Sequence, residues 1–204
     1  MPESSPLAPS ERDALIVVDV QNDFLPGGTL GVPEGDAVIE PLNRAIAEFR
    51  ASDRPVFYSR DWHPAEHCSF EARGGPWLPH CVADTSGAQF AAALDVAADA
   101  EVFSKATRPD RDAYSALDGT GLADRLRAQG VHRLFVGGLA TDYCVKATVL
   151  DAIAEGFEVI LLVDAIRAVN VDPDDGQHAI RAMTAAGACT RRISALGHAG
   201  ATPA

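Results

Sequence analysis

Four residues with chemically useful side chains stand at or just beyond the ends of apolar segments of this chain. Each follows a short run suited to a buried strand: Asp19 follows residues 14–18, Asp61 follows 56–58, Lys105 follows 102–103, and Cys144 follows 134–136 after a turn. In open α/β sheets, ligands bind outside the carboxyl ends of the strands. One such residue alone would more often be a charge facing water. Carboxylate, ammonium and thiol at one edge together favour a catalytic site.

Cys144 is the candidate nucleophile of this site. A free thiol has a pKa of about 8.5 and needs activation near neutrality. The start of a helix predicted at Cys144 favours thiolate, and an ammonium at about 4 Å, such as that of Lys105, adds on the order of 4 kcal/mol. Asp19 then fits the role of the base that receives the thiol proton and later returns it. The alternative is that Cys144 packs in the core as a small apolar residue.

A metal site is predicted next to these groups. In an extended segment Asp61 and His63 share one face, and His80 follows in the same irregular region. One carboxylate and two imidazoles suit zinc, iron or manganese. The plain alternative is a turn aspartate beside a surface histidine. A second alternative is a closed structural zinc site built from His67, Cys68, His80 and Cys81. This site is disfavoured because its Cys and His residues form adjacent dipeptides rather than the usual C-x-x-C spacing.

The elements that must position these residues alternate between strand and helix. Strands are predicted near residues 14–18, 56–58, 102–103, 134–136, 159–163 and 190–193, and helices near 38–49, 122–129, 144–155 and 174–186. This alternation predicts a three-layer α/β/α fold with a mainly parallel sheet of about six strands and Rossmann-like topology. The irregular, Pro- and Gly-rich residues 62–87 are typical of a functional loop.

Composition places further limits on the chain. Its 204 residues, 47% hydrophobic and 23% charged, suit one domain over residues 14–196, with unstructured segments at 1–13 and 197–204. A net charge of −12 without a basic run argues against nucleic acid or an anionic membrane as partner. The start of the chain lacks the features of a signal peptide and four cysteines suggest reduced thiols, so we expect a cytoplasmic protein.

Five ordered motifs resemble those of nicotinamidases among the isochorismatase-like cysteine hydrolases. The resemblance runs from about residue 14 to 193 and is carried by Ile16-Val17-Val18-Asp19-Val20-Gln21-Asn22-Asp23-Phe24, Asp61-Trp62-His63-Pro64, Trp77-Leu78-Pro79-His80-Cys81, Lys105, and Gly138-Leu139-Ala140-Thr141-Asp142-Tyr143-Cys144-Val145. It implies a catalytic triad of Asp19, Lys105 and Cys144, and one divalent metal ion on Asp61, His63 and His80. His67 matches a position that ligates metal in some members only.

The same resemblance implies how a substrate would be held. The backbone N–H groups of Ala140 and Cys144 would form an oxyanion hole, with a cis peptide between Leu139 and Ala140. Phe24, Trp77 and Tyr114 match positions that clamp a pyridine ring, although each could be an ordinary core aromatic. Residues 108–118 depart from the family's usual Gly-rich stretch, which leaves the contacts from that loop open.

The activity that the resemblance implies is hydrolysis of nicotinamide, a small-molecule substrate, to nicotinate and ammonia through a cysteine thioester. One alternative is another amidase of the superfamily, acting on a carbamoyl or ureido substrate through the same triad. A non-catalytic metal- or redox-sensing module is the alternative from another class. Whether the chain forms a homo-oligomer stays open.

Overall fold

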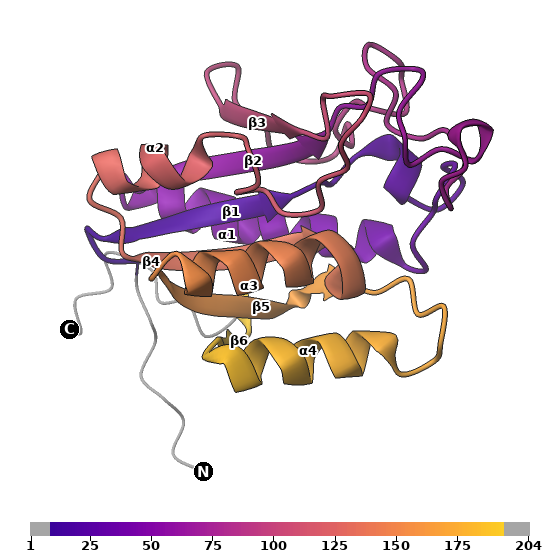
Figure 1. Ribbon diagram of the computed structural model, residues 1–204. Coiled ribbons are helices and arrows are strands. Elements are labelled where there is room, and N and C mark those ends of the chain that lie inside the picture. The colour runs from indigo at the N-terminus through magenta and orange to yellow at the C-terminus, as the bar shows by residue number, and fades with distance from the viewer. Residues whose placement is uncertain (1–8, 194–204) are drawn as a thin grey trace, which may run out of the picture.

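A six-stranded parallel sheet forms the centre of the computed structural model, which describes residues 9–193 (Figure 1). Its strands lie in the order β3-β2-β1-β4-β5-β6, and every neighbouring pair is parallel. Their bounds are β1 Asp13–Val18, β2 Val56–Asp61, β3 Glu101–Lys105, β4 Arg133–Leu139, β5 Glu158–Arg167 and β6 Cys189–Arg191. The predicted fold class is confirmed.

The strand bounds differ from the prediction mainly at their ends. The apolar runs mark only the buried middle of each strand, whereas β2 continues to Asp61 and β5 to Arg167. At the N-terminus, Asp13 belongs to β1 rather than to the predicted unstructured segment, because its carboxylate is buried and pairs with Arg133 at 2.6 Å. Residues 1–8, and the predicted tail 197–204, lie outside the described residues.

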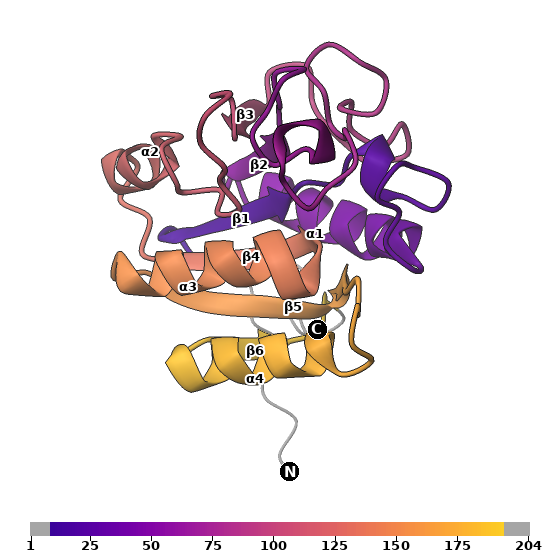
Figure 2. The same ribbon diagram turned by 45° about the vertical axis from the view of Figure 1, so that its right-hand side comes forward.

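Helices cover both faces of the sheet, as the three-layer prediction requires (Figures 1 and 2). One face packs against α1 (Ile39–Ala51), whose buried side chains meet Leu15 and Val17 of β1. The opposite face, with Ile16 and Val18, packs against α2 (Leu122–Ala128), α3 (Lys146–Ala154) and α4 (Asp175–Ala186). Alternate residues of β1 thus face opposite layers, and both are apolar because both faces are covered. No helix among residues 9–193 is long and apolar enough to cross a membrane.

Cys144 does not begin an α-helix, which corrects the predicted helix over residues 144–155. It lies in a π-helical turn, η4 (Thr141–Val145), and α3 begins only at Lys146. The carbonyl of Ala140 accepts hydrogen bonds from the N–H groups of both Tyr143 and Val145, at 3.1 Å each. Such wide turns occur frequently at functional sites. The turn sets Cys144 directly beyond the end of β4.

The strand order places β1 and β4 next to each other at the middle of the sheet. From β1 the chain builds outward through β2 to β3, and it then returns to β4 on the other side of β1. This reversal is the topological switch point at which α/β sheets bind ligands. Asp19 follows β1 and Cys144 follows β4, so the two residues flank the switch point.

Candidate active site

Lys105 lies at the centre of the candidate catalytic group. Its side chain is fully buried, and its Nζ is 2.9 Å from Oδ2 of Asp19 and 3.4 Å from Sγ of Cys144. The same ammonium forms an ion pair with Asp61 and donates to the carbonyl of Ala113 at 3.3 Å. The structure therefore brings together all four of the strand-end residues predicted to meet.

Asp19 is held in an unusual backbone conformation at the end of β1. Its φ is 49°, in the left-handed region, and its carboxylate is fully buried. Oδ1 accepts a hydrogen bond from the hydroxyl of Ser59 at 2.7 Å. Oδ2 lies within ion-pair distance of Lys105, yet it makes no hydrogen bond of good geometry. One carboxylate oxygen of Asp19 and the sulfur of Cys144 lie within 4.8 Å of each other, so the carboxylate is placed beside the thiol whose proton it would accept.

Burial controls the ionisation of the three groups. Burial raises the pKa of Asp19, although Lys105 opposes that rise. Burial also raises the pKa of Cys144 well above its usual value, against the influence of Lys105. For Lys105 burial acts to lower the pKa, but Asp19 and Asp61 outweigh it and the pKa is raised well above its usual value. The raised pKa of Cys144 is opposite in direction to the lowering by Lys105 that the sequence predicted. It favours the thiol form, so Cys144 needs a base such as the one predicted at Asp19.

The predicted metal-binding residues also converge. Donor atoms of Asp61, His63 and His80 lie within 4.8 Å of one another, and all three side chains are buried. Nδ1 of His63 contacts the carbonyl of His80 at 2.9 Å, and Nδ1 of His80 contacts the carbonyl of Leu78 at 2.8 Å. Both contacts leave Nε2 for a ligand, in the manner of carbonyl groups that orient metal-binding histidines.

The protonation state of His63 suits a metal ligand. Its burial and the neighbouring His80 lower the pKa of His63 to about 3. A neutral imidazole is the form that binds a metal ion. The donor set of two imidazoles and one carboxylate fits zinc, with a coordination position left for another group.

His67 is satisfied by protein contacts. Its Nδ1 is 2.7 Å from the hydroxyl of Ser69, and its Nε2 is 3.0 Å from the carbonyl of Arg111. It falls in a separate group of donors with His63 and Asp112. Among residues 9–193, the groups of donors that could hold a metal include neither Cys68 nor Cys81, so the alternative of a closed zinc site finds no support.

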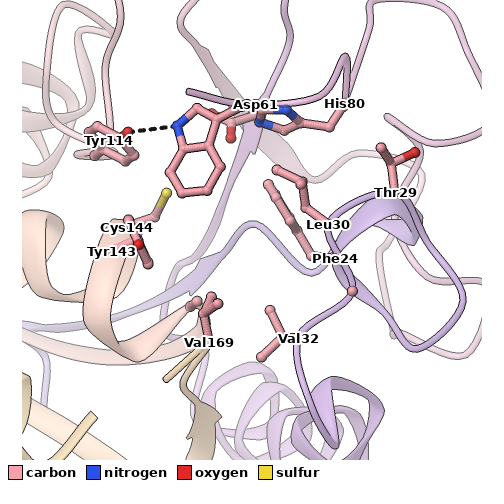
Figure 3. A pocket seen from close by; sticks show the side chains of 13 residues that line it. Phe24, Thr29, Leu30, Val32, Asp61, His80, Tyr114, Tyr143, Cys144 and Val169 are labelled. Carbon is pink, nitrogen blue, oxygen red and sulfur yellow. Dashed lines mark hydrogen bonds between the residues drawn. The ribbon is translucent and has the colours of Figure 1, made fainter. Parts of the chain in front are cut away.

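A cavity of about 280 Å³ opens above Cys144 (Figure 3). Its lining includes the predicted substrate residues Phe24, Trp77 and Tyr114, together with Asp61 and His80 from the metal-binding group. The indole of Trp77 donates a hydrogen bond to the hydroxyl of Tyr114 at 3.0 Å, which joins two loops across the cavity. A flat aromatic group of one ring fits a space of this size and lining.

The cavity lining also contains residues that sequence reasoning did not assign to a pocket. Val32, Tyr143 and Val169 line the cavity together with Cys144 (Figure 3). Tyr143 could have been suspected from its place next to the nucleophile. Val32 and Val169 have no distinguishing signal, because an apolar residue in a loop resembles any other core residue in sequence.

The predicted oxyanion-hole residues, Ala140 and Cys144, also line the cavity. The cis peptide predicted between Leu139 and Ala140 is confirmed. Two buried polar residues that sequence reasoning missed support the site from below. The hydroxyl of Ser59 donates to Asp19. The side-chain amide of Gln21 donates to the carbonyl of Asp61 and accepts from its N–H, each at 2.8 Å.

Comparison with known proteins gives relatives for nearly the whole described chain. The isochorismatase domain family matches residues 13–193. A nicotinamidase from Escherichia coli (strain K12) is 43% identical over 196 residues, covering 86% of this chain and 92% of the relative. The crystal structure of Pyrococcus horikoshii pyrazinamidase in complex with zinc is 48% identical, with a TM-score of 0.85, covering 89% of this chain and 99% of that one.

A second solved structure contains a bound pyridine carboxylate. The crystal structure of PnC1 from L. infantum in complex with nicotinate is 39% identical, with a TM-score of 0.87, covering 95% of this chain and 98% of that one. The family match covers all the strands and loops that converge on Cys144. The chain belongs to the isochorismatase domain family.

Proposed function

We propose that this protein hydrolyses nicotinamide to nicotinate and ammonia, with Cys144 as nucleophile. The observation that carries the proposal is the contact of Lys105 with both Asp19 and Cys144 at the base of an aromatic-walled cavity. The nicotinamidase from E. coli and the nicotinate complex of the L. infantum protein support the choice of substrate. One domain spanning residues 14–196 carries the activity in this proposal.

Asp61, His63 and His80 would hold one divalent metal ion at the rim of this cavity. Zinc, iron and manganese all suit these donors, and the zinc in the P. horikoshii structure favours zinc. When bound, such an ion supplies a positive charge that attracts the ring nitrogen of the substrate and so orients the amide. Phe24 and Trp77 would hold the faces of the ring.

In the first half of the proposed reaction, Cys144 attacks the amide carbon. Asp19 accepts the thiol proton, a C–S bond forms, and the carbonyl π pair moves to oxygen, where the N–H groups of Ala140 and Cys144 stabilise the negative charge. The charge of Lys105 stabilises the thiolate as it forms. Asp19 then gives the proton to the amide nitrogen and the C–N bond breaks. Ammonia departs, and the acyl group remains on Cys144 as a thioester.

In the second half, water replaces ammonia as the group beside Asp19. Asp19 removes a proton from the water while the oxygen attacks the thioester carbon, and the same N–H groups stabilise the second oxyanion. The C–S bond then breaks, the sulfur recovers the proton from Asp19, and the product leaves as nicotinic acid, which ionises to nicotinate. Each proton taken by Asp19 is returned within the cycle.

Two alternative functions can be distinguished from the proposed nicotinamide hydrolysis. An amidase for carbamoyl or ureido substrates would use the same triad, but it has no evident need for a metal-binding group beside the cavity. A metal- or redox-sensing module would react at Cys144 without releasing ammonia from any amide. The metal-binding group therefore favours an aromatic amide with a ring nitrogen.

Replacing Cys144 by alanine tests the nucleophile. The Cys144→Ala variant should release no ammonia from nicotinamide above background, because alanine offers no atom for acyl transfer. Its far-ultraviolet circular dichroism should match the parent protein. Cys189→Ala, which changes an exposed cysteine far along the chain, is the matched control and should keep full activity. Appreciable turnover by Cys144→Ala would remove Cys144 from the mechanism.

A further inference from the structure

Ser59 makes a buried contact to the proposed base that the mechanism above does not use. It lies in β2, the strand next to β1, and its side chain is fully buried. Its hydroxyl donates to Oδ1 of Asp19 at 2.7 Å, and its carbonyl accepts the N–H of Asp19 at 3.2 Å. Ser59 therefore holds Asp19 through both backbone and side chain.

The contact distinguishes the two oxygens of the Asp19 carboxylate. Oδ1 is occupied by the Ser59 hydroxyl, whereas Oδ2 makes no hydrogen bond of good geometry and lies 2.9 Å from Lys105. A carboxylate can rotate about its terminal bond over a broad range unless a partner holds it. With Oδ1 held, Oδ2 stays directed toward the Lys105 ammonium, which is itself 3.4 Å from Sγ of Cys144.

We infer that Ser59 is a positioning residue for the proposed amidase reaction: its hydroxyl holds Oδ1 of Asp19 so that Oδ2 is aligned to exchange protons with Cys144, the amide nitrogen and water. The inference rests on the proposed function for its substrate, but the geometry concerns the thiol and its base alone. Asp19 also occupies the left-handed backbone region, a strained conformation that persists only where the surrounding structure holds it.

The test compares Ser59→Ala and Ser59→Thr with the parent protein. Hydrogen bonds to charged groups have magnitudes that correspond to about 10- to 100-fold in rate, so Ser59→Ala should lower kcat for nicotinamide by that factor. The KM should stay within about threefold, because Ser59 does not line the cavity. Ser59→Thr keeps the hydroxyl and should therefore retain most of the kcat of the parent protein.

Alkylation of Cys144 by iodoacetamide provides a readout without nicotinamide. Mass spectrometry of the Cys144 peptide should show slower alkylation in Ser59→Ala and recovery in Ser59→Thr, because thiol deprotonation depends on the aligned Oδ2. The matched control is Thr148→Val, which removes another fully buried hydroxyl, bonded to the N–H of Ala116 at 2.9 Å. This control should lose stability without a selective loss of kcat.

The outcomes separate the two proposals. Wild-type rates of turnover and alkylation in Ser59→Ala would overturn the role of Ser59, as would an equal loss of kcat in Thr148→Val. If the parent protein released no ammonia from nicotinamide, while alkylation still slowed in Ser59→Ala and recovered in Ser59→Thr, the proposed substrate would be wrong and the role of Ser59 would stand.

Discussion

At the scale of single residues, the site depends on one buried positive charge. The chain has two lysines, Lys105 and Lys146. Lys105 is buried against two carboxylates and the thiol of Cys144. A buried ammonium is stable only when such partners offset the loss of hydration. The same ion pairs that offset the cost of burying Lys105 therefore also keep its ammonium charged.

Replacing Lys105 by methionine should affect stability and activity together. The variant leaves two carboxylates buried without a counter-charge, and breaking a buried ion pair costs about 3–5 kcal/mol. Urea unfolding at pH 8 should show a loss of that size, and ammonia release should fall to background. Lys146→Met, at the start of α3, should change the unfolding free energy by less than about 0.5 kcal/mol. Equal losses in both variants would contradict the role of Lys105.

At the scale of elements, the site depends on how closely β1 and β4 approach each other. Gly138 lies near the end of β4 with a φ of 130°, and a Cβ there would lie only 2.0 Å from the carbonyl oxygen of Val18. Val18 immediately precedes Asp19, and Gly138 comes shortly before the turn that holds Cys144. The absence of a side chain at Gly138 thus keeps Asp19 and Cys144 near each other.

The Gly138→Ala substitution should therefore damage both the sheet and the site. The added methyl group must push β1 and β4 apart, so we expect a loss of more than about 3 kcal/mol in unfolding free energy and a large fall in kcat. Gly156→Ala is the control, because Gly156 also has a positive φ but no atom within 4 Å of its added Cβ. It should cost about 1–2 kcal/mol and leave kcat unchanged. Similar behaviour of the two variants would show that backbone strain alone matters.

At the scale of the whole molecule, the parallel sheet collects groups that lie far apart along the chain. The candidate catalytic and metal-binding residues extend from Asp19 to Cys144 and meet at the switch point between β1 and β4.

The burial of His63 at this switch point affects the stability of the folded protein. His63 stays neutral in the folded protein down to about pH 3, while an unfolded histidine takes up a proton near pH 6.5.

The metal-free protein should therefore lose stability in mild acid. Between about pH 6.5 and 3 the unfolded chain binds a proton at His63 that the folded chain does not, so the free energy of unfolding falls as the pH is lowered. From pH 6.5 to 5 the contribution of His63 should amount to about 2 kcal/mol. Urea unfolding at several pH values, carried out on the chelated parent protein and on His63→Gln, measures this contribution as the difference between their unfolding free energies.

Zinc provides the complementary arm of this experiment. Adding zinc to the chelated parent protein at pH 7 should raise the unfolding free energy and restore ammonia release, because a metal ion that binds only the folded state stabilises it. His63→Gln should respond to zinc much more weakly. Parallel pH curves for the parent protein and His63→Gln would contradict the buried, neutral state of His63.

Much of this arrangement could be predicted because strand ends and their polar residues are local in sequence. The apolar runs identified all six strands, and Asp19, Asp61 and Lys105 could be placed at one edge because parallel strands share their direction. The start of α3 could not be predicted in the same way. The apolar stripe continues through residues 144–155, and the wide turn at Cys144 leaves no mark in hydrophobic periodicity.

The types and order of residues along the chain were thus enough to predict the layered fold and to select the candidate reacting groups and metal donors. Tertiary structure alone decided which Asp19 carboxylate oxygen is left for Lys105, that burial raises the pKa of Cys144, and that His67 is bound to protein. These features depend on contacts between segments separated by about 40 residues or more, such as Ser59 with Asp19 and Arg111 with His67. Burial and side-chain direction arise only when the strands are assembled, and they set the electrostatics of the site.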